Sequence, residues 1–216
     1  MTDTHERTQG TADELAQFIR SRLKPLQRQY LSPKRNGSVD SRLAQLRHAV
    51  TGAPGESAAI WDLPLDGVPR PGRTDVPSAT ERAAHTVCTL YALHQQAKRT
   101  PMFVDGISIG HAMRRLVRSH NAGADPEREG SLRLRFDALL TAESYEELTY
   151  HLCGLVQQFR AADVPLDYAR LAQDLVSLQR PHRVAGVRIR WGRDYHRLHL
   201  PGLHRIAAID GNGHNA

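Results

Sequence analysis

Apolar residues recur every three or four positions along most of the chain, the spacing that places them on one face of an α-helix. Residues 187–191 alternate like a strand, but Val184, Val187, Trp191 and Tyr195 also keep helical spacing, so we expect a helix there as well. The predicted fold class is therefore all-α. The runs that carry the pattern begin at Leu15, Leu43, Ala83, Ile109, Leu132, Leu148 and Leu171.

Short polar motifs indicate where some of these helices begin and end. Thr11–Glu14 and Ser144–Glu147 have the spacing of a capping box, in which a hydroxyl and a carboxylate satisfy the first backbone N–H groups of a helix. Proline has no N–H to donate within a helix, so Pro25 is expected to kink or end the first one.

The helices fall into two groups separated by a polar, glycine-containing segment, residues 121–130. We therefore predict two small helical-bundle subdomains, residues 11–122 and 127–205. Residues 62–80 hold four prolines and two glycines, which predicts a long loop within the first subdomain and disorder in it.

Composition excludes several classes of protein. The 216 residues include two cysteines, each in an apolar run and neither in a Cys-x-x-Cys spacing, so a disulfide framework and a zinc ribbon are not expected. The first ten residues are polar, and no stretch of about 18 uncharged apolar residues occurs, so we expect neither a signal peptide nor a membrane span. A cytoplasmic protein is the expectation.

The sequence contains none of the common catalytic motifs. It has no phosphate-binding Gly-x-x-x-x-Gly-Lys loop, no His-Glu-x-x-His pair and no Gly-x-Ser-x-Gly elbow. His196, His199 and His204 lie close together, but no thiolate or carboxylate pair joins them to complete a zinc site. We therefore expect no enzyme activity, no metal and no cofactor.

Positive charge is concentrated in clusters that contain few acids. The chain has 29 Lys and Arg against 23 Asp and Glu, a formal net charge of +6, and lysine occurs only at positions 24, 34 and 98. A cluster of bases without local acids attracts a polyanion such as nucleic acid. The candidate nucleic-acid-binding residues are Lys24, Arg28, Arg42 and Arg47 in the first cluster, Arg114, Arg115 and Arg118 in the second, and Arg133 and Arg135 in the third.

An arginine-rich surface that binds only water explains the same clusters, and both interpretations stay open for the group from Arg180 to Arg197. No zinc finger, homeodomain or other base-reading motif is present, so contact with nucleic acid would be to the backbone and independent of sequence.

The order and spacing of these features resemble the CasB family, the small subunit of the type I-E CRISPR surveillance complex Cascade. The similarity covers about residues 12–197. It is carried by Gly37, Ser38, Arg42, Leu43, Leu46 and Arg47; by Ala92–His94; by Gly106–Gly110, Ala112 and Arg115; by Arg133, Arg135, Phe136, Leu139 and Leu140; by Val164–Tyr168, Leu171, Asp174 and Leu175; and by Val187, Arg188, Trp191, Arg193, Asp194 and Tyr195.

The resemblance implies an all-helical, two-subdomain, non-enzymatic subunit. It implies that copies pair within the complex beside the crRNA-bearing backbone subunits and the large subunit, and that basic surfaces hold the target strand and the displaced non-target strand of DNA. The residues that match the basic positions of the family are Arg42, Arg47, Arg115, Arg133 and Arg135. Residues 62–80 and the tail after Arg197 depart from the shorter members of the family.

Three other functions fit parts of the same sequence. A stand-alone helical nucleic-acid-binding protein, such as a transcription regulator, would need a helix-turn-helix pair. A metal-dependent hydrolase would use the histidines, and a scaffold that binds only protein would leave the arginines without a ligand.

Overall fold

The computed structural model describes residues 2–72, 74–121 and 126–196, and in these residues the fold is all-α, as predicted. An isolated parallel bridge between Phe103 and Leu166 is the sole β-type pairing of the described residues. The helices are α1 (Thr2–Leu31), α2 (Gly37–His48), the short 3-10 helix η1 (Ala58–Ile60), α3 (Ala79–Gln95), α4 (Ile109–Asn121), α5 (Pro126–Thr141), α6 (Tyr145–Ala161), α7 (Tyr168–Leu178) and α8 (Pro181–His196).

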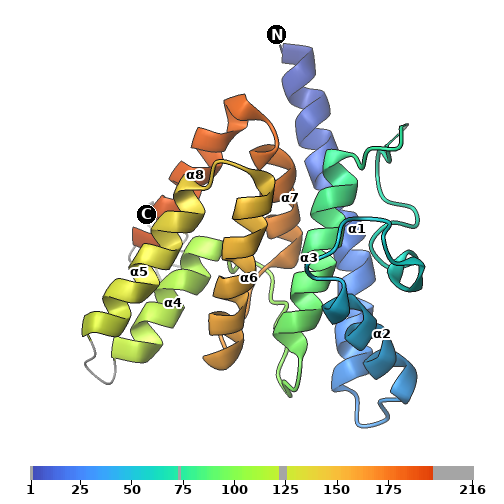
Figure 1. Cartoon of the computed structure of the whole chain (residues 1–216), viewed down its shortest axis with the longest axis horizontal. Helices are drawn as coiled ribbons and strands as arrows, with labels where there is room; N and C mark the ends of the chain where they lie inside the picture. Colours follow the sequence, from blue (N-terminus) through green and yellow to red (C-terminus); the bar gives the residue numbers. More distant parts are fainter. Residues whose placement is uncertain (1, 73, 122–125, 197–216) are drawn as a thin grey trace, which may run out of the picture.

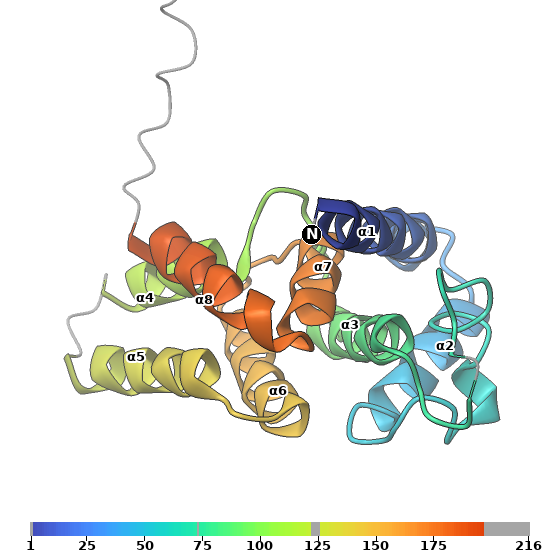
Figure 2. The ribbon, with the colours of Figure 1, turned by 90° about the horizontal axis from the view of Figure 1, so that it is seen from above.

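Helices α1, α2 and α3 lie at one end of the molecule and α4, α5 and α8 at the other, with α6 and α7 between them (Figures 1 and 2). Helix α1 packs on α7, and α3 packs on both α6 and α7. Buried residues from both ends belong to one hydrophobic cluster. The division into subdomains 11–122 and 127–205 stays a prediction, and residues 122–125 and 197–205 lie outside the described residues.

Side-chain caps begin several helices. At α3 the Ser78 hydroxyl accepts from the N–H of Glu81 while the Glu81 carboxylate accepts from the N–H of Ser78, a complete capping box. Ser144 caps α6 as expected, but the Glu147 carboxylate accepts from the N–H of Glu143.

The predicted start of the first helix is wrong, and the helix does not end at Pro25. The helix begins at Thr2, so Thr11 is an internal, buried residue and caps nothing. Pro25 lies inside α1, which continues to Leu31. The lost N–H of one proline is outweighed here because Leu23, Leu26 and Tyr30 on either side of it are buried in the core.

The connection between α3 and α4 passes through the centre of the molecule. Phe103, 1% exposed, donates its N–H to the side chain of Gln27 over 2.8 Å and accepts from the same amide over 3.1 Å. The N–H of Leu166 donates to the carbonyl of Met102. A buried irregular segment needs partners for its backbone polar groups, and α1 and the residues before α7 supply them.

Tyr168, the first residue of α7, joins that segment to α3. Its ring meets the rings of Tyr91 and Phe103 edge-on, with centroids 5.5 and 5.9 Å apart. Its hydroxyl is 2.9 Å from Nδ1 of His94 and donates to the carbonyl of Leu90 over 3.3 Å. Tyr168 therefore fixes α7 against α3 through both packing and hydrogen bonds.

The described residues of the segment 62–78 form turns and bends, and several of its apolar side chains pack against the helices. Leu63, Leu65 and Val68 are buried, and the hydroxyl of Thr80 donates to the carbonyl of Arg70. These contacts differ from the disorder expected from the prolines and glycines. The reason is that apolar residues placed between the prolines anchor the loop to the core.

Helices α4 and α8 approach each other closely at Gly110. An added Cβ at this position would collide with the carbonyl oxygen of Trp191 and lie 2.8 Å from the backbone nitrogen of Tyr195. Buried carboxylates join the same region: Asp194 accepts from Ser108 and Arg170, and Asp174 accepts from the indole of Trp191 over 2.6 Å. The missing side chain of Gly110 therefore permits a close helix–helix contact.

Replacing Gly110 with alanine should force α4 and α8 apart and lower the free energy of unfolding by at least about 2 kcal/mol, the usual size of an overpacking defect. Gly186→Ala in α8 is the matched control, because nothing lies within 4 Å of an added Cβ there. The control should be neutral or stabilise the helix by up to about 1 kcal/mol. Equal effects of the two changes in urea unfolding would contradict the close contact.

The pH dependence of the free energy of unfolding should reveal the low pKa of the buried His94 side chain. Burial lowers the pKa of His94 to about 3, whereas a histidine in an unfolded chain titrates near 6.5. Below about pH 6.5 the unfolded state therefore takes up a proton that the folded state does not, and the free energy of unfolding should fall by up to about 1.4 kcal/mol per pH unit. Urea unfolding of the wild type and His94→Leu between about pH 7 and pH 5 measures this.

The difference between the two proteins isolates His94, because His85, whose pKa burial also lowers, is present in both. The variant should lose less stability than the wild type as the pH falls. Parallel pH profiles would mean that His94 accepts a proton in the folded protein.

Candidate nucleic-acid interface

Three of the nine predicted cations are paired with acids inside the chain. Arg42 on α2 forms an ion pair with Asp62, and Arg133 on α5 forms one with Glu129. Lys24 lies 2.8 Å from a carboxylate oxygen of Asp105. An internal acid competes with a phosphate for the same cation, so these three are weaker candidates than the sequence indicated.

Lys24 also has a structural role. Its ammonium group lies 4.1 Å from the centroid of the Phe103 ring and donates to the carbonyl of Phe103 over 3.3 Å. It therefore helps to hold the buried connection between α3 and α4.

Five of the predicted cations have no side-chain hydrogen bond or ion pair to another described residue. Four of them are exposed and Arg47, in the last turn of α2, is half-buried. Phosphate binding would break no internal pair at any of these positions. The five are Arg28, Arg47, Arg115, Arg118 and Arg135.

These five arginines come from both ends of the molecule. Arg28 and Arg47 lie on α1 and α2, whereas Arg115 and Arg118 share the exposed side of α4 and Arg135 lies on α5, which packs against α4. The arginines of α1 and α2 and those of α4 and α5 thus lie on the surface of the same fold. Arg114 differs from its two neighbours because it is half-buried and its Nη1 is buried without a hydrogen-bond partner.

The acid-free stretch of the first helix is neutralised by acids from distant segments. Arg20 lies 3.3 Å from a carboxylate oxygen of Asp105, and Arg22 lies 3.8 Å from one of Asp66. In α8, Arg190 lies 2.7 Å from the buried Asp174. A lack of acids nearby in sequence did not predict a lack of acids nearby in space.

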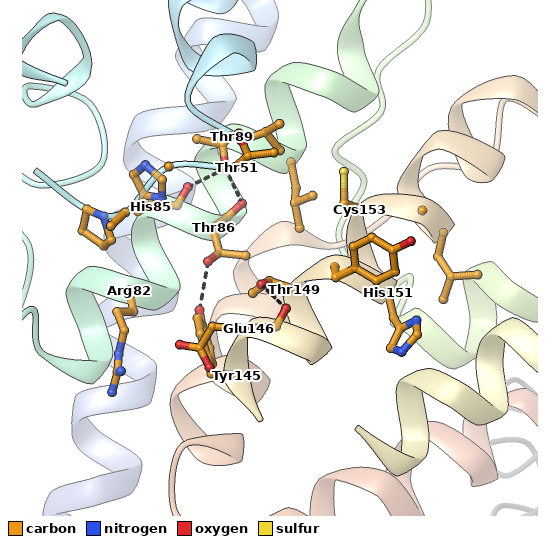
Figure 3. Close-up of a pocket in the computed structure, with 18 of the residues that line it drawn as sticks. Thr51, Arg82, His85, Thr86, Thr89, Tyr145, Glu146, Thr149, His151 and Cys153 are labelled. Carbon is orange, nitrogen blue, oxygen red and sulfur yellow. Dashed lines mark hydrogen bonds between the residues drawn. The ribbon is translucent and has the colours of Figure 1, made fainter. Parts of the chain in front are cut away.

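A cavity of about 770 Å³ lies between α3 and α6 and is also lined by residues 50–54, Glu56 and Arg135. Figure 3 shows Thr86 of α3 directed at Tyr145 of α6, with Arg82, His85 and Thr89 on the same helix α3. The Thr86 hydroxyl and the Tyr145 hydroxyl are 2.9 Å apart and join the two helices at its floor. The sequence analysis missed this cavity, although the aromatic Tyr150 at a polar position of the α6 pattern was a signal for it.

The described part of the chain offers no group of metal-binding residues, and its buried cysteine is unreactive. No three His, Cys, Asp or Glu residues are placed there to hold a metal ion, and His199 and His204 lie outside the described residues. Burial raises the pKa of the Cys88 thiol well above its ordinary value, which keeps it protonated and unreactive. None of the described helices is long and apolar enough to cross a membrane.

Comparison with solved structures finds several similar chains. The structure is similar to CasB from Thermobifida fusca, with 28% sequence identity, a TM-score of 0.66, and coverage of 85% of this chain and 98% of that one. A Cse2-family CRISPR-associated protein from Thermus thermophilus is 22% identical, with a TM-score of 0.58 and coverage of 85% and 96%. A chain described as part of a CRISPR RNA-guided surveillance complex is 22% identical, with a TM-score of 0.62 and coverage of 84% and 93%.

Comparison of the sequence with curated proteins finds no match. A family model does match: that of CRISPR-associated protein Cse2, over residues 42–196. The matched region contains α3 to α8 and most of α2, so it spans well over half of the chain and both ends of the fold. This chain therefore belongs to the CRISPR-associated Cse2 family, as the resemblance to CasB predicted.

Proposed function

We propose that this protein is a non-catalytic small subunit of a type I-E CRISPR surveillance complex and that it holds DNA strands through its arginines to stabilise the R-loop in antiviral defence. Membership of the Cse2 family supports the assignment to such a complex. The fold supports it too, since a chain of a CRISPR RNA-guided surveillance complex has a similar one.

The observation that carries the strand-holding role is a set of five arginines that are unpaired among the described residues: Arg28, Arg47, Arg115, Arg118 and Arg135. Contact between a guanidinium and a phosphate releases counterions and reads no base, which suits a subunit that serves every guide sequence. Opening a DNA duplex to pair with a guide RNA is nearly balanced in free energy, so a few such contacts decide whether the open state persists.

The partners of this role are crRNA, the target and non-target DNA strands, the backbone and large subunits of the complex, and a second copy of the chain. Arginines along a displaced single strand would oppose its return to the duplex. Arg42, Arg133 and Lys24 contribute less in this proposal, because each exchanges an internal acid for a phosphate.

The alternative of a stand-alone transcription regulator is less well supported. A helix-turn-helix joins its two helices by a turn of about three or four residues. The arginine-bearing α4 does not follow such a turn, because residues 96–108 separate it from α3, and it packs mainly on α8.

Changing the five unpaired arginines to alanine should abolish most binding to single-stranded DNA of scrambled sequence. Each lost contact should reduce the slope of log affinity against log salt by about 0.7. The control variant removes the same charge from five cations that pair with acids and lie outside the predicted set: Arg20, Arg22, Arg35, Arg70 and Lys98.

The control should retain most of the affinity and the salt slope of the wild type in fluorescence anisotropy. Equal losses in the two variants would mean that affinity follows net charge alone. Absence of binding by the wild type to DNA or RNA would contradict the strand-holding role of the free protein.

In a reconstituted complex with guide RNA, the variant that lacks the five unpaired arginines should assemble but form a shorter-lived R-loop. The lifetime is measured from the return of the displaced strand to the duplex after excess competitor is added. An unchanged lifetime in an intact complex would assign the arginines no part in strand holding.

A further inference from the structure

The cavity between α3 and α6 has buried polar atoms in its wall that form no hydrogen bond with the described residues. His85 is 4% exposed, and its Nε2 has no hydrogen-bond partner among the described residues. Nε of Arg82, one helical turn away on α3, is also buried without a partner. Buried polar atoms of this kind cost free energy unless a ligand or water satisfies them.

The charges of the side chains that line the cavity nearly cancel. Arg82 and Arg135 line it together with Glu56 and Glu146. Burial lowers the pKa of His85, although the nearby Glu56 opposes this, so its imidazole is neutral at pH 7. A neutral polar ligand with both hydrogen-bond donors and acceptors fits such walls better than an anion does.

The mouth of the cavity has a different character. Tyr150 on α6 lines it and is 77% exposed, the most exposed of the large hydrophobic side chains in the described residues. Its ring stands at 69° to that of His151, with the centroids 5.5 Å apart. An exposed aromatic ring beside a cavity is a stacking surface for a flat ligand.

Arg135 completes the arrangement from α5. It lines the cavity, is exposed, and has no partner among the described residues. One nucleotide of a single strand matches this arrangement. Its neutral base fits the neutral polar interior, and its anionic phosphate lies next to the cation at the rim.

We propose that this cavity takes an unstacked base from a single strand of nucleic acid, with Tyr150 stacked on a base at the mouth and Arg135 on the adjoining phosphate. The inference rests on the proposed function, because it places one part of the bound strand. It adds a contact that duplex DNA cannot make, since the bases of a duplex are already stacked and paired.

The test compares the affinity of the full chain for single-stranded and duplex DNA of the same scrambled sequence. Tyr150→Ala should weaken binding to the single strand by roughly 5- to 100-fold, the usual effect of removing a stacking ring. The salt slope should not change, because no charge is lost. Duplex affinity should also be unchanged.

Two further variants test whether the effect of Tyr150→Ala comes from losing the aromatic ring, from losing its hydroxyl, or from losing any exposed apolar side chain. Tyr150→Phe keeps the stacking surface and should bind the single strand like the wild type. Leu134→Ala removes an exposed apolar side chain from the neighbouring α5 that does not line the cavity, and it should have no effect. Arg135→Ala should instead lower the salt slope by about 0.7.

Thermal unfolding followed by circular dichroism checks that the variants fold, which is expected because Tyr150 is exposed. If Tyr150→Ala binds the single strand like the wild type while the five-arginine variant does not, the base site is overturned and the proposed function stands. If the wild type binds neither DNA nor RNA, both fail. If Tyr150→Ala keeps its DNA affinity but no longer binds a second copy in size-exclusion chromatography, the cavity is a protein contact and the base site is overturned.

Discussion

The fold depends on satisfying the backbone of one connection, residues 102–107, which is buried at Met102, Phe103 and Ile107. Gln27 of α1 holds both polar groups of Phe103, and Leu166 and Asp167 hold Met102, Val104, Gly106 and Ile107. Irregular backbone is tolerated in a core only when every polar group finds a partner. Because these partners come from α1 and from the entrance to α7, the connection fixes the positions of both helices, and through Tyr168 it also fixes α3.

Apolar periodicity predicted most of the fold because α-helices that bury one face must repeat at that spacing. The apolar runs that begin at Ala83, Leu148 and Leu171 lie in α3, α6 and α7, and the helix preferred to a strand near Trp191 is α8. Sequence-based expectations failed where burial of apolar side chains outweighed the local effect of a proline. Pro25 is kept within α1 by the core contacts around it, and the prolines of residues 62–80 did not prevent Leu63 and Val68 from packing. Neither effect is visible without the partner helices.

The candidate site was harder to predict than the fold, because charge acts through space and a sequence gives only neighbours along the chain. Asp105 and Asp66 approach α1 from residues far away, so a helix with an acid-free stretch carries several ion pairs. The resemblance to CasB correctly indicated the family, and it ranked Arg42 and Arg133 with Arg47, Arg115 and Arg135. The structure separates these residues by whether each arginine already forms an ion pair with an acid of the chain. Matching sequence motifs does not reveal this difference.

The packing of α1 on α7 has a consequence for how the chain is synthesised. The two helices that meet in the core are separated by most of the sequence, so α1 leaves the ribosome long before its partner exists. Until α7 has emerged, the face of α1 that carries Leu15, Ile19 and Leu23 has no α7 to cover it. Contacts between such distant segments slow folding and leave apolar surface open to aggregation. Folding to the native core is therefore completed only late in translation.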